Sequence, residues 1–137
     1  MNDDANHPNG NFGLLACGSS GRWTVDIDES PDGTEWSLQL DGPQVYLAVS
    51  LQSLGVLANV HEYLRSGRAS DPELPFGHFG AARVSLNWDN EDVRRCFVIV
   101  SGVRDALRVT LSAEDTVMLA AALEQVLDDV PPEARTG

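Results

Sequence analysis

The fold of this chain is decided by the stretch Gln44-Val45-Tyr46-Leu47-Ala48-Val49-Ser50, which runs directly into residues 51–66. Valine and leucine occupy every second position of the quoted stretch, as they do in a strand with one buried face. In the residues that follow, the apolar spacing changes to three and four, which is typical of an amphipathic helix, at Leu54, Leu57, Val60 and Leu64. The pattern predicts a strand that leads straight into a helix.

The same pattern occurs a second time. Residues 106–111 are expected to form a strand, and residues 113–129 an amphipathic helix that Ser112 caps at its N-terminus. Further upstream, Arg22-Trp23-Thr24-Val25-Asp26-Ile27-Asp28 aligns with Arg83-Val84-Ser85-Leu86-Asn87-Trp88-Asp89. Arginine meets arginine, threonine meets serine, and the last residue of both stretches is aspartate. The alignment predicts an internal duplication.

The order of the expected elements defines the fold class. Short loops such as Ser30-Pro31-Asp32-Gly33 separate consecutive strands, so each half is expected to be an antiparallel meander of three or four strands. One helix follows each meander, which predicts an α+β chain built from a (β)βββα unit that occurs twice. Neither unit alone buries both its sheet and its helix. We therefore expect the halves to pack about a pseudo-two-fold axis.

The chain is expected to form one domain, because its 137 residues are enough for one core and no more. The connection between the halves is expected at residues 68–80, where proline and glycine interrupt the periodicity. The expected organisation is a disordered N-terminal arm over residues 1–11, a domain over 12–130 with pseudo-repeats 12–67 and 76–130, and a C-terminal tail over 131–137.

The charge of the chain excludes several functions. The formal net charge is −12, and all 9 basic residues are arginines, so lysine chemistry such as a Schiff base or a phosphate-loop lysine is absent. A charge of this sign opposes binding to nucleic acid and to anionic membranes, and it leaves a basic protein partner or self-association open. The polar, acidic N-terminus lacks the features of a secretory signal, so a cytoplasmic location is expected.

Metal and cofactor signals are weak throughout. Cys17 and Cys96 are far apart without clustered histidines, so we expect reduced thiols and no zinc site. Asp28-Glu29-Ser30-Pro31-Asp32-Gly33 begins like a calcium loop, but the twelfth position is Gln39. The stretch is interpreted as a hairpin turn, with a cation site as the alternative. No catalytic motif is present, so no cofactor is predicted and an enzyme is the less expected class.

The connection between the halves carries the first candidate binding site. Its last residues are Phe76-Gly77-His78-Phe79-Gly80, and functional residues are frequent in such segments. Phe76, His78 and Phe79 are therefore candidate binding residues. In the alternative interpretation, the two phenylalanines tuck against the sheet. His61 lies at the edge of the apolar face of the first helix, where it can be either a partly buried structural histidine or a ligand contact.

Arginine is concentrated in the second half, which supplies the second candidate site. Four arginines come from neighbouring expected strands and form a predicted basic patch: Arg94, Arg95, Arg104 and Arg108. In the alternative interpretation, these side chains pair with Asp89, Glu91, Asp92 and Asp105. Three tryptophans occupy inward-facing strand positions and are interpreted either as core anchors or as a stacking surface: Trp23, Trp36 and Trp88.

In its expected topology, the chain resembles the Whirly and PUR-type single-stranded nucleic-acid binders across roughly residues 12–130. In those families bases meet the outer faces of the sheets, helped by basic and aromatic side chains. The outer strand faces of this chain carry Asp26, Asp28 and Asp89 instead. The sequence therefore favours a non-enzymatic protein-binding or regulatory module, which can be homodimeric. Single-stranded nucleic-acid binding and a small-ligand or enzymatic role near His78 are the alternatives.

Overall fold

The computed structural model describes residues 12–43, 45–65, 73–89, 94–101 and 105–130, with the backbone alone at Asp89, Arg94 and Asp105. The predicted arm and tail lie outside these residues. In chain order, the elements are β1 (Gly13–Ser20), β2 (Trp23–Glu29), β3 (Trp36–Asp41), β4 (Tyr46–Leu51), α1 (Val56–Arg65), β5 (Glu73–Phe79), β6 (Ala82–Asp89), β7 (Arg94–Ser101), β8 (Asp105–Thr110) and α2 (Ala113–Asp129).

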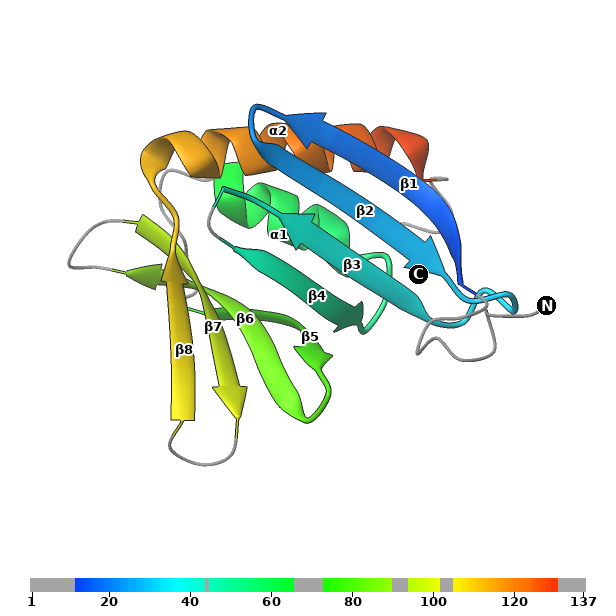
Figure 1. Cartoon of the computed structure of the whole chain (residues 1–137), viewed down its shortest axis with the longest axis horizontal. Coiled ribbons are helices and arrows are strands. Elements are labelled where there is room, and N and C mark those ends of the chain that lie inside the picture. The colour runs from blue at the N-terminus through cyan, green and yellow to red at the C-terminus, as the bar shows by residue number, and fades with distance from the viewer. Residues whose placement is uncertain (1–11, 44, 66–72, 90–93, 102–104, 131–137) are drawn as a thin grey trace.

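All eight strands form one antiparallel sheet in the order of the chain (Figure 1). The predicted α+β class and the meander of strands are confirmed. The two halves of the sheet, β1–β4 and β5–β8, are joined through two residue pairs, Ser50 with His78 and Leu51 with Gly77. Neighbouring strands within each half share longer ladders. The β4–β5 junction is therefore the narrowest connection in the sheet.

The helices cover one face of the first half of the sheet (Figure 1). Helix α2, which ends the chain's second half, packs on β1, β2 and α1. The contact with β1 is close because Gly18 has no side chain there: a Cβ atom would collide with the carbonyl oxygen of Ala122. The Gln125 side chain pairs with the backbone of Ser19 through hydrogen bonds of 3.0 and 2.7 Å. The C-terminal helix thus ties the two halves together.

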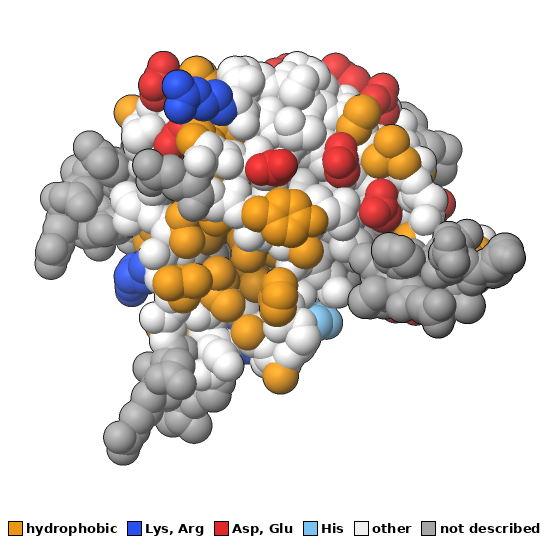
Figure 2. Space-filling model, viewed as in Figure 1, with side chains coloured by type: hydrophobic (Ala, Val, Ile, Leu, Met, Phe, Trp, Pro, Cys, Tyr) orange, Lys and Arg blue, Asp and Glu red, His pale blue; other side chains and the backbone are white. Residues whose placement is uncertain are grey.

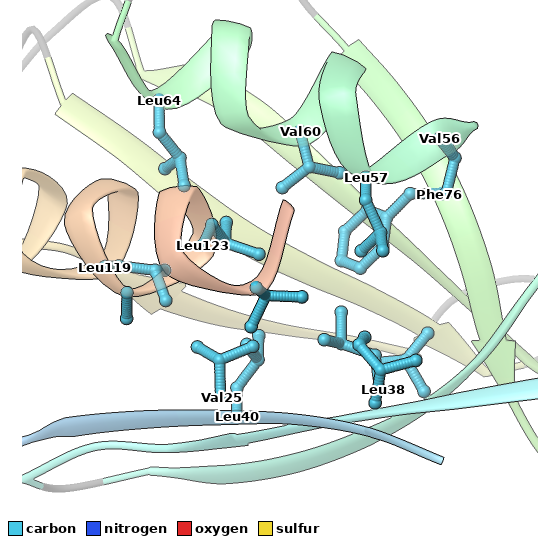
Figure 3. Packing of buried hydrophobic residues seen from close by; sticks show 14 of the residues in the cluster. Val25, Leu38, Leu40, Val56, Leu57, Val60, Leu64, Phe76, Leu119 and Leu123 are labelled. Carbon is cyan, nitrogen blue, oxygen red and sulfur yellow. The ribbon is translucent and has the colours of Figure 1, made fainter. Parts of the chain in front are cut away.

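One hydrophobic core spans both halves and both helices (Figure 3). The alternation in β2 is confirmed, since Trp23, Val25 and Ile27 are buried whereas the residues between them are not. In Figure 3, Leu57 of α1 and Leu123 of α2 lie on the side of the strands from which Val25, Leu38 and Leu40 project. Both helices contribute buried side chains to this core: Leu57, Val60 and Leu64 from α1, and Leu119, Leu123 and Val126 from α2.

Two boundaries differ from the prediction. The expected connection over residues 68–80 contains a strand, β5, whose pairing with β6 shifts register between Pro75 and Gly77. Because of that bulge, apolar and polar residues do not alternate along β5, and the sequence pattern gives no sign of a strand. Strand β1 runs on to Ser20, although Gly18-Ser19-Ser20-Gly21 has the composition of a turn, and the chain turns at Gly21, where φ is 60°. None of the described helices is long and apolar enough to cross a membrane.

Candidate binding surface

Strand β5 separates the three candidate residues of the predicted first site. Phe76 is 0% exposed, and its ring centroid lies 6.0 Å from that of Phe97, so its side chain belongs to the core. His78 is exposed and pairs with Ser50 and Arg83 on the face without helices. Phe79 is 56% exposed on the other face, because successive strand residues point to opposite sides. The structure does not bring the three side chains together.

The predicted arginine patch is also divided. Arg95 pairs with Trp88 and is buried on the helix-covered face, whereas Arg108 pairs with Val98 and is exposed on the opposite face. The Nη1 atom of Arg108 lies 3.5 Å from the Cys96 sulfur. The side chain of Arg94 and the whole of Arg104 lie outside the described residues. Arg95 and Arg108 therefore cannot act on one ligand from the same face.

The contacts of the Arg95 side chain indicate that it stabilises the fold. Its Nε atom donates a hydrogen bond of 3.1 Å to the carbonyl oxygen of Tyr63, and its guanidinium carbon lies 4.3 Å from the centroid of the Trp88 ring. Tyr63 is in the last turn of α1, where carbonyl oxygens lack partners within the helix. Burial lowers the pKa of the Arg95 guanidinium, and Tyr63 opposes that shift. A cation at this helix end is favourable.

Arg95→Ala is expected to lower the free energy of unfolding by about 2–3 kcal/mol, because it removes a hydrogen bond from a cation and a stacked contact on an aromatic ring. Arg95→Lys should lose less, since it retains the charge. The matched control is Arg108→Ala on the neighbouring strand, whose side chain is exposed, with an expected change of less than about 0.5 kcal/mol. Urea unfolding followed by circular dichroism measures these differences. Equal losses at the two arginines would contradict a structural role specific to Arg95.

An apolar surface lies at the end of the second half of the sheet. Leu107 pairs with Ile99, and Ile99 pairs with Val84, so the three side chains share the face on which Phe79 and Ala82 also lie. Leu107 is 60% exposed and Ile99 is half-buried. We call Phe79, Ile99 and Leu107 the end patch. Figure 2 shows hydrophobic side chains gathered over the part of the molecule where β5–β8 lie.

One row of polar residues crosses the opposite face of the sheet. A row of directly paired residues crosses five strands, from Asp28 through Ser37, Ser50 and His78 to Arg83. The row therefore begins with an anion in the first half and ends with a cation in the second half. We call this side of the sheet the outer face, because in Figure 1 both helices lie behind the β1–β4 strands.

At the acidic end of the outer face, the surroundings of Asp28 change its pKa. Burial raises the pKa of Asp28, and the neighbouring carboxylate of Asp26 raises it further. Asp41 is exposed on the same face, paired with Thr24 and Tyr46. Three carboxylates on one face repel phosphate groups, so the outer face of the first half does not suit a nucleic-acid backbone.

The stretch that begins like a calcium loop is a closed hairpin turn. Asp32 Oδ1 accepts hydrogen bonds from Ser30 Oγ at 2.7 Å, Thr34 Oγ1 at 2.8 Å and Thr34 N at 3.2 Å. These bonds from Ser30 and Thr34 lower the pKa of Asp32. Gly33 has a φ of 71°, as its place in the turn requires. Within the described ranges, no group of three or more metal-binding side chains is close enough to hold an ion.

The tryptophans are anchored and form no open stacking surface. Trp23 is buried and its Nε1 atom donates to Asp115 at 3.1 Å. Trp36 is half-buried and donates to Glu29 at 2.9 Å. Trp88 is half-buried beneath Arg95. Of the two interpretations of these residues, the structure supports anchoring.

A groove of about 340 Å³ lies between the two helices. We call it the helix groove, and its lining residues come from α1 and α2: His61, Leu64, Arg65, Val117, Ala120, Ala121 and Glu124. The His61 Nε2 atom is buried, and none of the described residues forms a hydrogen bond with it. His78 borders neither this groove nor a second hollow of about 280 Å³ near the start of α2.

The sequence matches no protein-family model, and no curated protein sequence is significantly similar to it. Sequence reasoning missed two site residues, Leu107 and Ile99. Leu107 alternates like an ordinary core residue of a strand, and Ile99 lies in the continuous apolar run of residues 96–100. Only the position of the helices leaves them uncovered. The sequence did not predict the groove, although His61 was expected at the edge of the apolar face of the first helix.

Proposed function

We propose that this chain is a non-enzymatic module that binds another protein through the end patch. The observation that carries the proposal is the exposure of Phe79 and Leu107 on either side of Ile99, on a sheet face that is elsewhere covered by helices. Large contiguous apolar patches on a protein surface typically mark interaction sites. The net charge of −12 favours a partner with a positively charged rim around its apolar contact residues.

We also propose that the chain is a duplicated unit with a Whirly- or PUR-like pseudo-two-fold topology. Four strands followed by one helix occur twice in the element order, which supports the duplication. The aligned helix positions have the same environment, since Val60 and Leu123 are buried, as are Leu64 and Leu127. A duplication of this kind explains the fold of the two halves. It does not imply a shared function, which depends on the surface residues of each half.

Single-stranded nucleic-acid binding is the second candidate, and the outer face supports it in part. Arg83 and Arg108 are exposed there, together with His78. Three exposed or half-exposed carboxylates on the other half of the same face oppose it. The three residues of the end patch are uncharged, so the protein-binding proposal does not depend on the balance of arginines and carboxylates on the outer face.

The protein-binding proposal predicts a position-specific cross-link. A photoreactive phenylalanine analogue at position 107, in the full chain expressed in its native host, is expected to form one defined adduct. The same analogue at Val117, which is exposed on α2, is the control and should not form it. With the partner identified by mass spectrometry and purified, Leu107→Asp should weaken its binding by at least tenfold, the loss of about 1.4 kcal/mol expected for an exposed apolar contact at an interface.

Three outcomes would change the proposal. An adduct between two copies of the chain, with a dimer in light scattering that Leu107→Asp dissociates, would identify the partner as a second copy. The same adduct from positions 107 and 117 would contradict a role for the end patch. Retention of a single-stranded oligonucleotide at low salt, lost in Arg83→Gln with Arg108→Gln, would favour the nucleic-acid alternative.

A further inference from the structure

The helix groove has the right size for a small molecule, and one of its lining residues carries a nitrogen without a hydrogen-bond partner among the described residues. Its volume of about 340 Å³ lies within the range of about 300–1,000 Å³ that is usual for small-ligand sites. That residue is His61, whose buried Nε2 atom has no hydrogen-bond partner within the part of the chain that the structure describes. Buried polar atoms without partners are rare in folded proteins. A ligand group that forms a hydrogen bond with this nitrogen would remove the deficit.

The α1 wall of the groove suits a carboxylate. His61 and Arg65 are four residues apart, so they lie one above the other on the same side of the helix, and both line the groove. Arg65 presents a planar guanidinium, which binds carboxylates through paired hydrogen bonds. When it carries a proton, His61 Nε2 donates to the same group. The two side chains together form a candidate clamp for one carboxylate.

The α2 wall of the groove suits an ammonium group and a short aliphatic chain. Glu124 lines this wall and can accept hydrogen bonds from a cation. The other lining residues are Leu64 from α1 and Val117, Ala120 and Ala121 from α2, which present only hydrocarbon. The small alanine side chains leave room between the helices. The groove therefore offers separate surfaces for a positive, a negative and an apolar group.

We propose that the helix groove binds a small zwitterion with an aliphatic side chain, the chemistry of a free apolar α-amino acid. Such a ligand uses the clamp, the carboxylate of Glu124 and the apolar lining at once. A simple anion is repelled by Glu124 and by the net charge of −12, and a simple cation leaves His61 and Arg65 without a partner. The groove lies between the helices, and it shares no residue with the end patch.

The ligand class is tested by titrating the full-length chain with L-leucine and recording amide chemical shifts by nuclear magnetic resonance. Millimolar leucine is expected to shift the amides of residues 61–65 and 117–124. Two analogues of similar shape provide the comparison: 4-methylpentanoate, which lacks the ammonium group, and isoamylamine, which lacks the carboxylate. Each should bind at least tenfold more weakly, because each loses one charge-assisted interaction.

Substitutions at exposed residues test the assignment of the walls. Arg65→Gln is expected to weaken leucine binding by roughly tenfold, and Glu124→Gln to remove the preference for leucine over 4-methylpentanoate. Glu62→Gln is the control, because Glu62 is exposed on α1 and does not line the groove. Unchanged urea midpoints verify that the variants fold. No shift at these amides with leucine, equal affinity for leucine and both analogues, or an equal effect of Glu62→Gln would overturn the proposal.

Discussion

Gly77→Ala is expected to lower the free energy of unfolding by about 3 kcal/mol or more, a large part of the 5–15 kcal/mol that stabilises a typical domain. A Cβ atom at Gly77 would collide with the carbonyl oxygen of Ser50 and with Cγ1 of Val49. Ser50 contributes backbone, which cannot rotate away as the end of a long side chain can. The strands must therefore separate to accommodate one methyl group.

The location of Gly77 makes this separation costly. The pair formed by Leu51 and Gly77 is one of the two that join β4 to β5, and the other, between Ser50 and His78, is its immediate neighbour. Loss of this junction weakens the hydrogen-bonded connection between the two halves, which leaves the packing of the helices to hold them together. We expect a lower urea midpoint, together with faster exchange of the amide hydrogens around Leu51.

Gly13→Ala is the matched control for this substitution. Gly13 also lies in a strand, but a Cβ atom there meets no atom of the described residues within 4 Å, and its φ is not positive. The expected change in the free energy of unfolding is within about 0.5 kcal/mol. If Gly77→Ala were as harmless as Gly13→Ala, the close approach of β4 and β5 in this structure would be wrong.

Phe76→Ala is expected to lower the free energy of unfolding by about 3–5 kcal/mol, the usual cost of removing a fully buried aromatic ring. Phe76 is completely buried, and its ring is tilted by 59° against that of Phe97. Figure 3 shows it beneath Leu57 and Val56 of α1, so the ring joins the second half of the sheet to the first helix. The cavity left by alanine would lie at this contact.

Phe79→Ala provides the comparison three residues away. Phe79 is mostly exposed, so its truncation is expected to change the free energy of unfolding by less than about 1 kcal/mol while it weakens binding at the end patch. Urea unfolding measures the first effect, and the affinity of the cross-linked partner measures the second. A large loss of stability from Phe79→Ala, or a small one from Phe76→Ala, would reverse the assignment of the two residues to patch and core.

Much of the secondary structure follows from local patterns. The alternation of Trp23, Val25 and Ile27 predicts β2, because the period of a strand is two and one face is buried. The second helix has the expected bounds, Ala113–Asp129, and the side chain of Ser112 accepts the hydrogen bond from Asp115 N that defines an N-cap. These features depend on residues that are near one another in the chain.

The candidate sites were less accessible from the sequence. Whether Arg95 and Arg108 share a face depends on the register between β7 and β8. A shift of the pairing by one residue would move the side chains of one strand to the other face. The bulge at Pro75 and Gly77 hid β5, so the sequence left open whether Phe76 binds a partner or packs against the sheet. No local pattern contains either piece of information, since both arise from pairing between segments that are distant in the chain.

The amino-acid sequence alone was sufficient for the α+β class, the meander of strands and the excess of negative charge, since periodicity and composition are local properties. Only the tertiary structure showed which apolar strand residues stay exposed. Leu107 and Phe97 belong to the same apolar pattern on neighbouring strands, yet one is at the surface and the other in the core. The reason is the extent of the helices, which cover only one end of this face of the sheet. Helix α2 packs there on β1, and these two elements lie at opposite ends of the chain, so no local pattern reveals their contact.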